Sequence, residues 1–300
     1  MGRRKCYARR PLDAGLRLVQ VVAVAALVGA SAGCAQMPPS IRGEEMAVSG
    51  TGITVPSPRA LTGEEISSLP AATHGAVIPG LLPFSQITGV PATGYTLVRD
   101  AALYGPDWNR PVARFPALNF LGEPSVVVGV AEQDGYVLVL TPARRELPSA
   151  RPAAATTPAA AQTAAWIARE DLTEPRPITT WIRVSVGEQT LTIFEGSSEQ
   201  ASFRIGVGAA QTPTPTNVTG YLQARYFDPD QGQVDHRIQL TSLHATEQDE
   251  PYAGQDGGLI GAHFQDVADG AVSHGCLRLD AEALAEVDAL PLGTLVTIVP

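Results

Sequence analysis

The sequence predicts a mainly β fold with a single late helix. Short β-branched or aliphatic runs separated by turn residues begin near Tyr95. From Ile178 to the C-terminus the chain alternates densely between apolar and polar residues. Only the segment after Asp280 places a longer set of apolar residues at helical spacing. These three observations predict two β-rich domains, the second of which closes with a helix and a last strand.

The composition is that of a globular, acidic protein. The chain has 300 residues, of which 44% are hydrophobic and 17% charged, with 25 Pro and 29 Gly that favour many turns. Its formal net charge is −9. Because nucleic-acid binding needs a basic face to neutralise phosphates, we expect no nucleic-acid partner.

The N-terminus has the pattern of an export signal. Residues 3–17 are basic and residues 18–32 are small and apolar, which predicts a signal peptide over residues 1–33. The ending Ala32-Gly33-Cys34 resembles a bacterial lipoprotein cleavage site, which would make Cys34 the lipidated first residue of the mature chain. The alternative is ordinary cleavage after Ala32, with Cys34 left as a thiol. Both predict a protein of the cell envelope, and the first places it on the outer face of the membrane through a lipid anchor.

Cysteine usage argues against a disulfide-stabilised fold. With Cys6 in the signal and Cys34 at the cleavage site, Cys276 is the one thiol left for the folded part of an exported chain. Its role must therefore be sought in chemistry or in simple packing.

The first part of the predicted mature chain shows little periodicity. Residues 34–93 are rich in Pro, Gly, Ser and Thr, with one short candidate helix near 63–69, and are predicted to be a flexible tether. Residues 94–173 carry the short strands of a small β-barrel, interrupted at about 146–164 by an Ala/Pro-rich stretch that we expect to be disordered. The run from Ala102 to Leu172 resembles the bacterial Src-homology-3-like domains that precede catalytic domains in exported actinobacterial wall enzymes. An unrelated β-rich spacer is the alternative.

Residues 178–300 are predicted to form the second domain. A hairpin is expected from 182–186 and 191–194, joined at Gly187-Glu188-Gln189, and a third strand over 203–207. Further strands are predicted near 220–227 and 237–243. Asp280 is a good N-cap for a helix that stops at Pro291, before a last strand over 294–299.

One cysteine lies among two histidines in this domain. Cys276 follows His274 by two residues and His263 by thirteen. A thiol attacks carbonyls as the thiolate, and a neighbouring imidazole can lower its pKa from about 8.5. Gly275 permits a sharp turn that could aim adjacent N–H groups at a developing oxyanion. The spacing does not decide which histidine is the base.

Two other readings of these residues stay open. A lone cysteine is commonly a small buried apolar residue. His263, His274 and Cys276 could instead form a three-ligand zinc site, although the chain lacks a Cys-x-x-Cys pair and a His-Glu-x-x-His helix. We therefore expect no metal and no cofactor.

The surrounding motif resembles the active-site signature of the L,D-transpeptidase catalytic domain, a β-sandwich family that remodels bacterial peptidoglycan. The signature is carried by Ile260 to His263 and by Ala271 to Leu279. The hairpin over 182–194, the strand over 203–208 and the threonine-proline loop over 212–216 extend the resemblance across residues 178–300. Phe264 and Asn217 stand where the family usually has glycine, and the loop from 263 to 273 is short.

The resemblance implies a peptidoglycan enzyme that makes 3→3 crosslinks between donor and acceptor stem peptides through a Cys276 thioester. By this resemblance, His263 is the proton donor and acceptor. Ser273, His274 and Gly275 would shape the oxyanion site, in which the amides of Gly275 and Cys276 are the expected donors. Arg278 would hold a carboxylate or brace the loop. Alternatives are an L,D-carboxypeptidase, which gives the same thioester to water, and a non-catalytic wall-binding lipoprotein.

Overall fold

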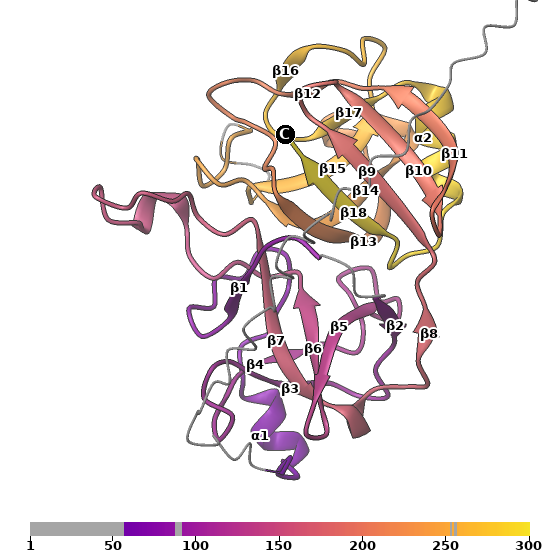
Figure 1. The fold of residues 1–300 in the computed structure, drawn as a ribbon. Coiled ribbons are helices and arrows are strands. Elements are labelled where there is room, and N and C mark those ends of the chain that lie inside the picture. Colours follow the sequence, from indigo (N-terminus) through magenta and orange to yellow (C-terminus); the bar gives the residue numbers. More distant parts are fainter. Residues whose placement is uncertain (1–56, 88–91, 253, 255–256) are drawn as a thin grey trace, which may run out of the picture. The chain divides into compact units, whose positions relative to one another are not determined.

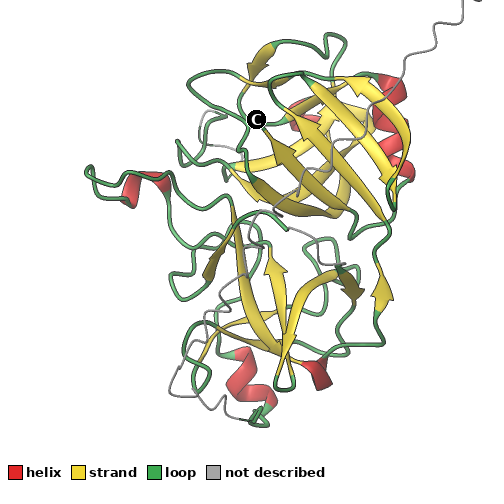
Figure 2. Ribbon diagram, viewed as in Figure 1, coloured by secondary structure: helices red, strands yellow, loops and turns green. Residues whose placement is uncertain are grey.

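The computed structural model describes residues 57–87, 92–252, 254 and 257–300. The predicted signal peptide, Cys34 and residues 34–56 of the predicted tether lie outside these ranges. Within them, strands dominate and helices are few and short, which confirms the mainly β fold (Figure 2). In the described part of the chain, no helix is long and apolar enough to cross a membrane.

The first sheet has eight strands in the order β4-β3-β7-β6-β5-β2-β8, with β1 also paired to β7 (Figure 1). The strands are β1 Leu82–Phe84, β2 Thr93–Tyr95, β3 Ala101–Tyr104, β4 Pro111–Phe115, β5 Val127–Gln133, β6 Tyr136–Thr141, β7 Gln162–Ala168 and β8 Arg176–Pro177. The helical segments are α1 Gly63–Ser67 and the 3-10 turns η1 Pro148–Ala150 and η2 Arg169–Asp171. The antiparallel pairing of β5, β6 and β7 is the centre of this sheet. The Src-homology-3-like likeness of this region stays a prediction.

The prediction of a flexible tether up to residue 93 is wrong for residues 57–87. Thr62 caps α1 by accepting a hydrogen bond from the Glu65 N–H, and β1 pairs with β7. Ala72, Ile78 and Leu81 are buried in the apolar core of the first sheet. These apolar residues are too widely spaced to give a strand or helix period, so the sequence pattern did not reveal them.

The predicted disordered loop at 146–164 is also corrected. Residues 162–164 belong to β7, the strand on which the sheet is built, and Gln162, Thr163 and Ala164 are buried. Earlier in the stretch, the Ser149 N–H and hydroxyl both donate to the Asp249 carboxylate, at 2.9 and 2.6 Å. The small Ala and Thr residues at the end of this stretch have the composition of a disordered segment. In the structure, the same small side chains suit a strand that is packed closely on both faces.

The second sheet has eight strands in the order β11-β10-β9-β18-β13-β14-β15-β17 (Figure 1). They are β9 Thr180–Ser185, β10 Thr190–Glu195, β11 Ser198–Arg204, β13 Val218–Asp228, β14 Gln233–His244, β15 Leu259–Phe264, β17 Leu277–Leu279 and β18 Leu295–Val299. A separate parallel pair joins β12 Val207–Gly208 to β16 Ala271–Ser273, and η3 Pro229–Gln231 lies between β13 and β14. The predicted hairpin is the β9–β10 pair, with Gln189 in the left-handed region at φ 53°.

The late helix is α2 Ala281–Ala289, and its predicted N-cap is confirmed. The Asp280 carboxylate accepts the Ala283 N–H at 2.8 Å. Ala283, Leu284 and Val287 face the core of this β-sandwich, and the helix ends before Pro291. Cys276 does not lie directly at the helix start, because β17, which contains Arg278, stands between Cys276 and Asp280.

The two sheets share a common apolar cluster, and residues 52–300 form one compact unit. Tyr221 on β13 is packed with Val128, Leu140 and Ala164 of the first sheet. Buried polar groups join them as well, since the Ser242 hydroxyl donates to the Gln162 side-chain oxygen at 2.6 Å. The first sheet is thereby fixed against β13 and β14, the strands that lead to the candidate site.

Candidate active site

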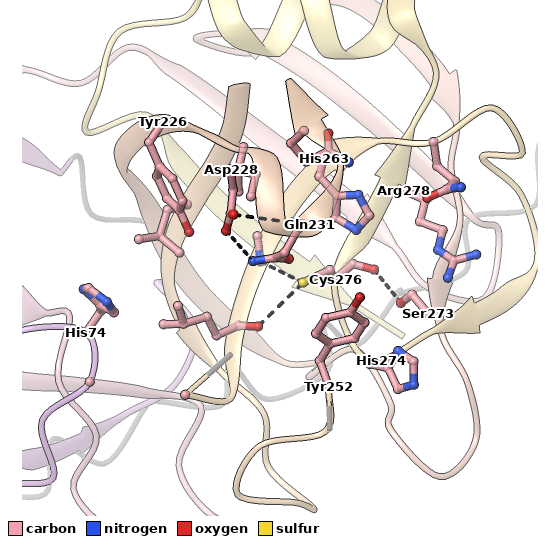
Figure 3. A pocket seen from close by; sticks show the side chains of 18 of the residues that line it. His74, Tyr226, Asp228, Gln231, Tyr252, His263, Ser273, His274, Cys276 and Arg278 are labelled. Atoms are coloured by element: carbon pink, nitrogen blue, oxygen red, sulfur yellow. Dashed lines mark hydrogen bonds between the residues drawn. The ribbon is translucent and has the colours of Figure 1, made fainter. Parts of the chain in front are cut away.

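A cavity of about 490 Å³ brings together the polar residues predicted from the motif (Figure 3). Cys276, His263, His274, Ser273 and Arg278 all line it. The cavity also has walls that no motif pointed to, among them His74, Phe120, Tyr226, Asp228, Gln231 and Tyr252.

Cys276 lies in the turn between β16 and β17, and its side chain is half-buried. Its sulfur is 3.4 Å from the Gly261 N–H donor and 3.6 Å from the Leu259 carbonyl oxygen, both on β15. β15 and β17 pair in parallel with His263 opposite Arg278. This pairing carries His263 to the cavity that holds the thiol.

His263 is held in the form that can accept a proton. Its Nδ1 lies 3.1 Å from the Phe264 carbonyl oxygen, and a carbonyl can only accept, so Nδ1 carries the hydrogen and Nε2 keeps its lone pair. Burial lowers the pKa of His263, the Phe264 carbonyl partly opposes this, and the charge of Arg278 lowers it further. The imidazole is therefore neutral at pH 7.

Ser273 closes the turn that presents the cysteine. Its hydroxyl oxygen accepts the Gly275 N–H at 3.1 Å and its hydrogen is donated to the Cys276 carbonyl at 2.6 Å. Gly275 has φ 114°, and a Cβ there would lie 2.8 Å from the Ile260 side chain, so only glycine fits. The expectation that the Gly275 amide faces an oxyanion is corrected, since this N–H is turned toward Ser273.

The threonine-proline loop supports the same turn from outside. The Thr214 hydroxyl accepts the Gly208 N–H and donates to the Gly275 carbonyl, both at 2.8 Å. The Thr212 hydroxyl donates to the Ser273 carbonyl at 3.0 Å. Sequence reasoning noted this loop as a family feature but assigned no role to its threonines. The sequence feature that could have indicated this role is the pair of threonines two residues apart, whose side chains can reach the same neighbouring segment.

We expect Thr214→Val to destabilise the protein by about 2–4 kcal/mol, because two buried backbone groups lose their partner. Thr212→Val is the matched control: this hydroxyl is half-buried and makes one hydrogen bond, so it should cost about 1 kcal/mol. Denaturant unfolding of the two variants measures the difference. Equal losses would show that Thr214 does not hold the turn.

Arg278 braces the site through its backbone and leaves its guanidinium in the cavity. Its N–H donates to the Gly206 carbonyl at 2.9 Å and its own carbonyl accepts the Gly206 N–H at 3.0 Å. The buried Nε has no hydrogen-bond partner among the described residues. The two roles expected as alternatives, holding a carboxylate and bracing the loop, stay predictions.

His274 contacts Tyr252 across the cavity wall. Its side chain is exposed, and its ring meets that of Tyr252 edge-on, with centroids 5.5 Å apart (Figure 3). His263 is less exposed than His274.

The β13–β14 connection supplies a second wall. Burial, together with the charges of Asp228 and Cys276, raises the pKa of Tyr226 to about 12. Asp228 accepts the Gln231 side-chain N–H at 2.8 Å and the Asp230 N–H at 3.1 Å, which orders this rim of the cavity. These residues lie about fifty positions before Cys276, so no local pattern could assign them.

Two departures from the family pattern have local explanations. Asn217 adopts φ 56°, a left-handed conformation that asparagine tolerates where glycine is usual. Phe264 packs against the core and lies 4.3 Å from the His236 ring, centroid to centroid, and it is absent from the cavity lining. Its side chain therefore does not narrow the cavity.

Among the described residues, no group of three or more His, Cys, Asp or Glu side chains is placed to hold a metal ion. The site residues instead present a thiol, a neutral imidazole and a guanidinium around one cavity.

Comparison with known families assigns the second domain. Residues 179–298 match the family model described as the L,D-transpeptidase catalytic domain, YkuD. A search of curated proteins found no match.

Solved structures of similar proteins include three L,D-transpeptidases. One from Enterococcus faecium is 18% identical over 40% of this chain and 49% of its own, with a TM-score of 0.29. One from Mycobacterium smegmatis is 17% identical over 57% and 93%, with a TM-score of 0.33. L,D-transpeptidase 1 of Mycobacterium tuberculosis is 14% identical over 46% and 78%, with a TM-score of 0.30. Because these scores are low, the assignment of the domain rests on the family model. The matched region covers about half of the length of two of the similar chains, 49% in one and 52% in the other.

Proposed function

Because residues 179–298 match the family model of the L,D-transpeptidase catalytic domain, we propose that this protein is a peptidoglycan L,D-transpeptidase that joins stem peptides by 3→3 crosslinks. Cys276 is the nucleophile, and His263 is the proton donor and acceptor. The observation that carries the proposal is that a half-buried thiol and a half-buried imidazole, whose pKa is lowered by burial, line one cavity together with Arg278.

In the first step, the Cys276 sulfur gives its proton to Nε2 of His263 and attacks the carbonyl carbon of the third residue of a tetrapeptide stem. The C–N bond to the terminal D-alanine breaks, and the leaving amine takes the proton from His263. A thioester remains on Cys276. The ring orientation fixed by the Phe264 carbonyl supports this assignment, because it keeps Nε2 as the acceptor.

In the second step, the side-chain amine of an acceptor stem loses a proton to His263 and attacks the thioester carbon. The C–S bond breaks, the released Cys276 sulfur takes the proton back from His263, and the new amide is the crosslink. Ser273 and Gly275 act as positioning residues that hold the turn, while the Cys276 N–H is the proposed oxyanion donor. Arg278 receives a substrate carboxylate and His274 lines the acceptor side with Tyr252.

Product analysis tests the reaction. Incubation of the protein with a stem tetrapeptide should release D-alanine, and adding a second amine-bearing stem should yield the crosslinked dimer. Release of tripeptide alone, with or without the amine, would instead identify an L,D-carboxypeptidase. Absence of all products would favour the non-catalytic wall-binding reading.

We further propose that the protein acts outside the cytoplasm, anchored by a lipid on Cys34. The export pattern and the Ala32-Gly33-Cys34 ending support this placement. A Cys34→Ala protein should leave the membrane fraction of cells that express it. Unchanged membrane association would contradict the lipid anchor.

A further inference from the structure

The cavity around Cys276 has one wall that does not belong to the catalytic domain. His74, Gly75 and Phe120 line it, and all three precede residue 179, where the family match begins. The catalytic domain by itself would therefore leave this side of the cavity open.

Three aromatic rings form a continuous row along this wall. The His74 ring meets Phe120 edge-on with centroids 4.7 Å apart, and Phe120 meets Tyr226 edge-on at 5.5 Å. Tyr226 lies on β13 and lines the same cavity as Cys276, whose charge contributes to the raised pKa of Tyr226. The row thus joins the first sheet's loops to the reactive centre.

The row is held rigidly at its outer end. The carbonyl oxygen of His74 lies 2.9 Å from Nε2 of His244, which is fully buried on β14. Burial lowers the pKa of His244 to about 3, so this anchor stays neutral, with Nε2 carrying the donated hydrogen. Residue 74 is therefore fixed to the second sheet.

The loop that carries Phe120 is fixed by its own hydrogen bonds. The Asn119 side-chain oxygen accepts the N–H groups of Leu121 and Glu123 at 2.9 and 3.0 Å. The Asn119 N–H donates to the Glu123 carbonyl at 2.8 Å, and Gly122 supplies the left-handed turn at φ 77°. The loop keeps its shape without help from Phe120.

The Phe120 side chain is 46% exposed. It belongs to none of the apolar core clusters of the described residues. A rigid, half-exposed aromatic ring in the cavity of a nucleophile is suited to bind apolar surface of a substrate at little cost in ordering.

We propose that Phe120 and His74, with Tyr226, form a substrate-positioning wall that binds the aliphatic part of a stem peptide, its alanine methyl groups and methylene chain. This inference rests on the proposed function and names where specificity for the peptide arises. Charged groups of the peptide would face Arg278 and Asp228, which line other parts of the same cavity. The aromatic wall would then contact the aliphatic groups of the peptide.

Steady-state kinetics of the full chain test the wall. Phe120→Ala should raise KM for a stem tetrapeptide roughly five- to tenfold, with kcat changed less than about twofold, because the lost contact is apolar burial far from bond breaking. Phe120→Tyr keeps the ring and should restore KM. Leu121→Ala is the matched control, an exposed apolar residue of the same loop that does not line the cavity. Equal KM values for Phe120→Ala and Leu121→Ala would overturn the proposal.

A binding measurement separates this inference from the proposed reaction. In a Cys276→Ala background, titration with the tetrapeptide should give a dissociation constant that Phe120→Ala raises by the same factor. If the wild-type protein turns over no stem peptide but this difference persists, the proposed reaction fails and the wall stands. If the disaccharide without peptide binds and loses affinity on Phe120→Ala, the wall recognises sugar and the peptide assignment is wrong.

Discussion

Replacing Cys276 by alanine is expected to lower the release of D-alanine from a stem tetrapeptide by at least about 10³-fold, since the covalent intermediate can no longer form. The thiol lines the same cavity as His263, whose pKa is lowered by burial. The measurement is D-alanine release by the wild-type and variant proteins at equal concentration.

The fold should survive this substitution. The sulfur is half-buried, and its contacts with the Gly261 N–H and the Leu259 carbonyl are long and weak. We expect the free energy of unfolding to change by less than about 1 kcal/mol. Activity that persists in a folded Cys276→Ala protein would contradict the assignment of the nucleophile.

Replacing His263 by glutamine is expected to reduce turnover by about 10²- to 10⁴-fold, the usual range for loss of a general acid–base group. Because burial lowers the pKa of His263, the neutral, proton-accepting form persists below the usual imidazole pKa of about 6.5. The acid limb of the kcat/KM profile should therefore lie below that pH, with activity lost as pH falls through the lowered value.

His274→Gln is the informative comparison for this prediction. Its ring is exposed and contacts Tyr252, so its loss should affect substrate binding more than the pH profile. If His274→Gln removed the acid limb and His263→Gln did not, the roles of the two histidines would be reversed.

The local elements of the second domain could be predicted because their signals are local. The alternation of Ile182 and Val184 defines a strand, and Asp280 marks a helix start with its own side chain. The gathering of Cys276 and His263 at one cavity followed from the motif. The motif could not predict which way individual backbone N–H groups point. The Gly275 N–H, for example, donates to the Ser273 hydroxyl, a contact that depends on the three-dimensional shape of the turn.

The rest of the site depends on contacts between distant segments. Tyr226 and Asp228 reach the cavity because β13 and β14 pair over a long stretch, and Phe120 because its loop returns to those strands. No periodicity marks such residues. Likewise, Ala72 and Leu81 in the predicted tether are isolated apolar residues whose burial depends on a sheet formed far along the chain.

The central claim is that Cys276 is an activated nucleophile that forms acyl-enzymes. Intact-protein mass spectrometry after exposure to a carbapenem, an acylating β-lactam, tests it most directly, with peptide mapping to locate the adduct. We predict one added carbapenem, on Cys276, and no adduct on a folded Cys276→Ala protein. An unmodified Cys276 in the wild-type protein, or an equal adduct on the alanine variant, would contradict the claim.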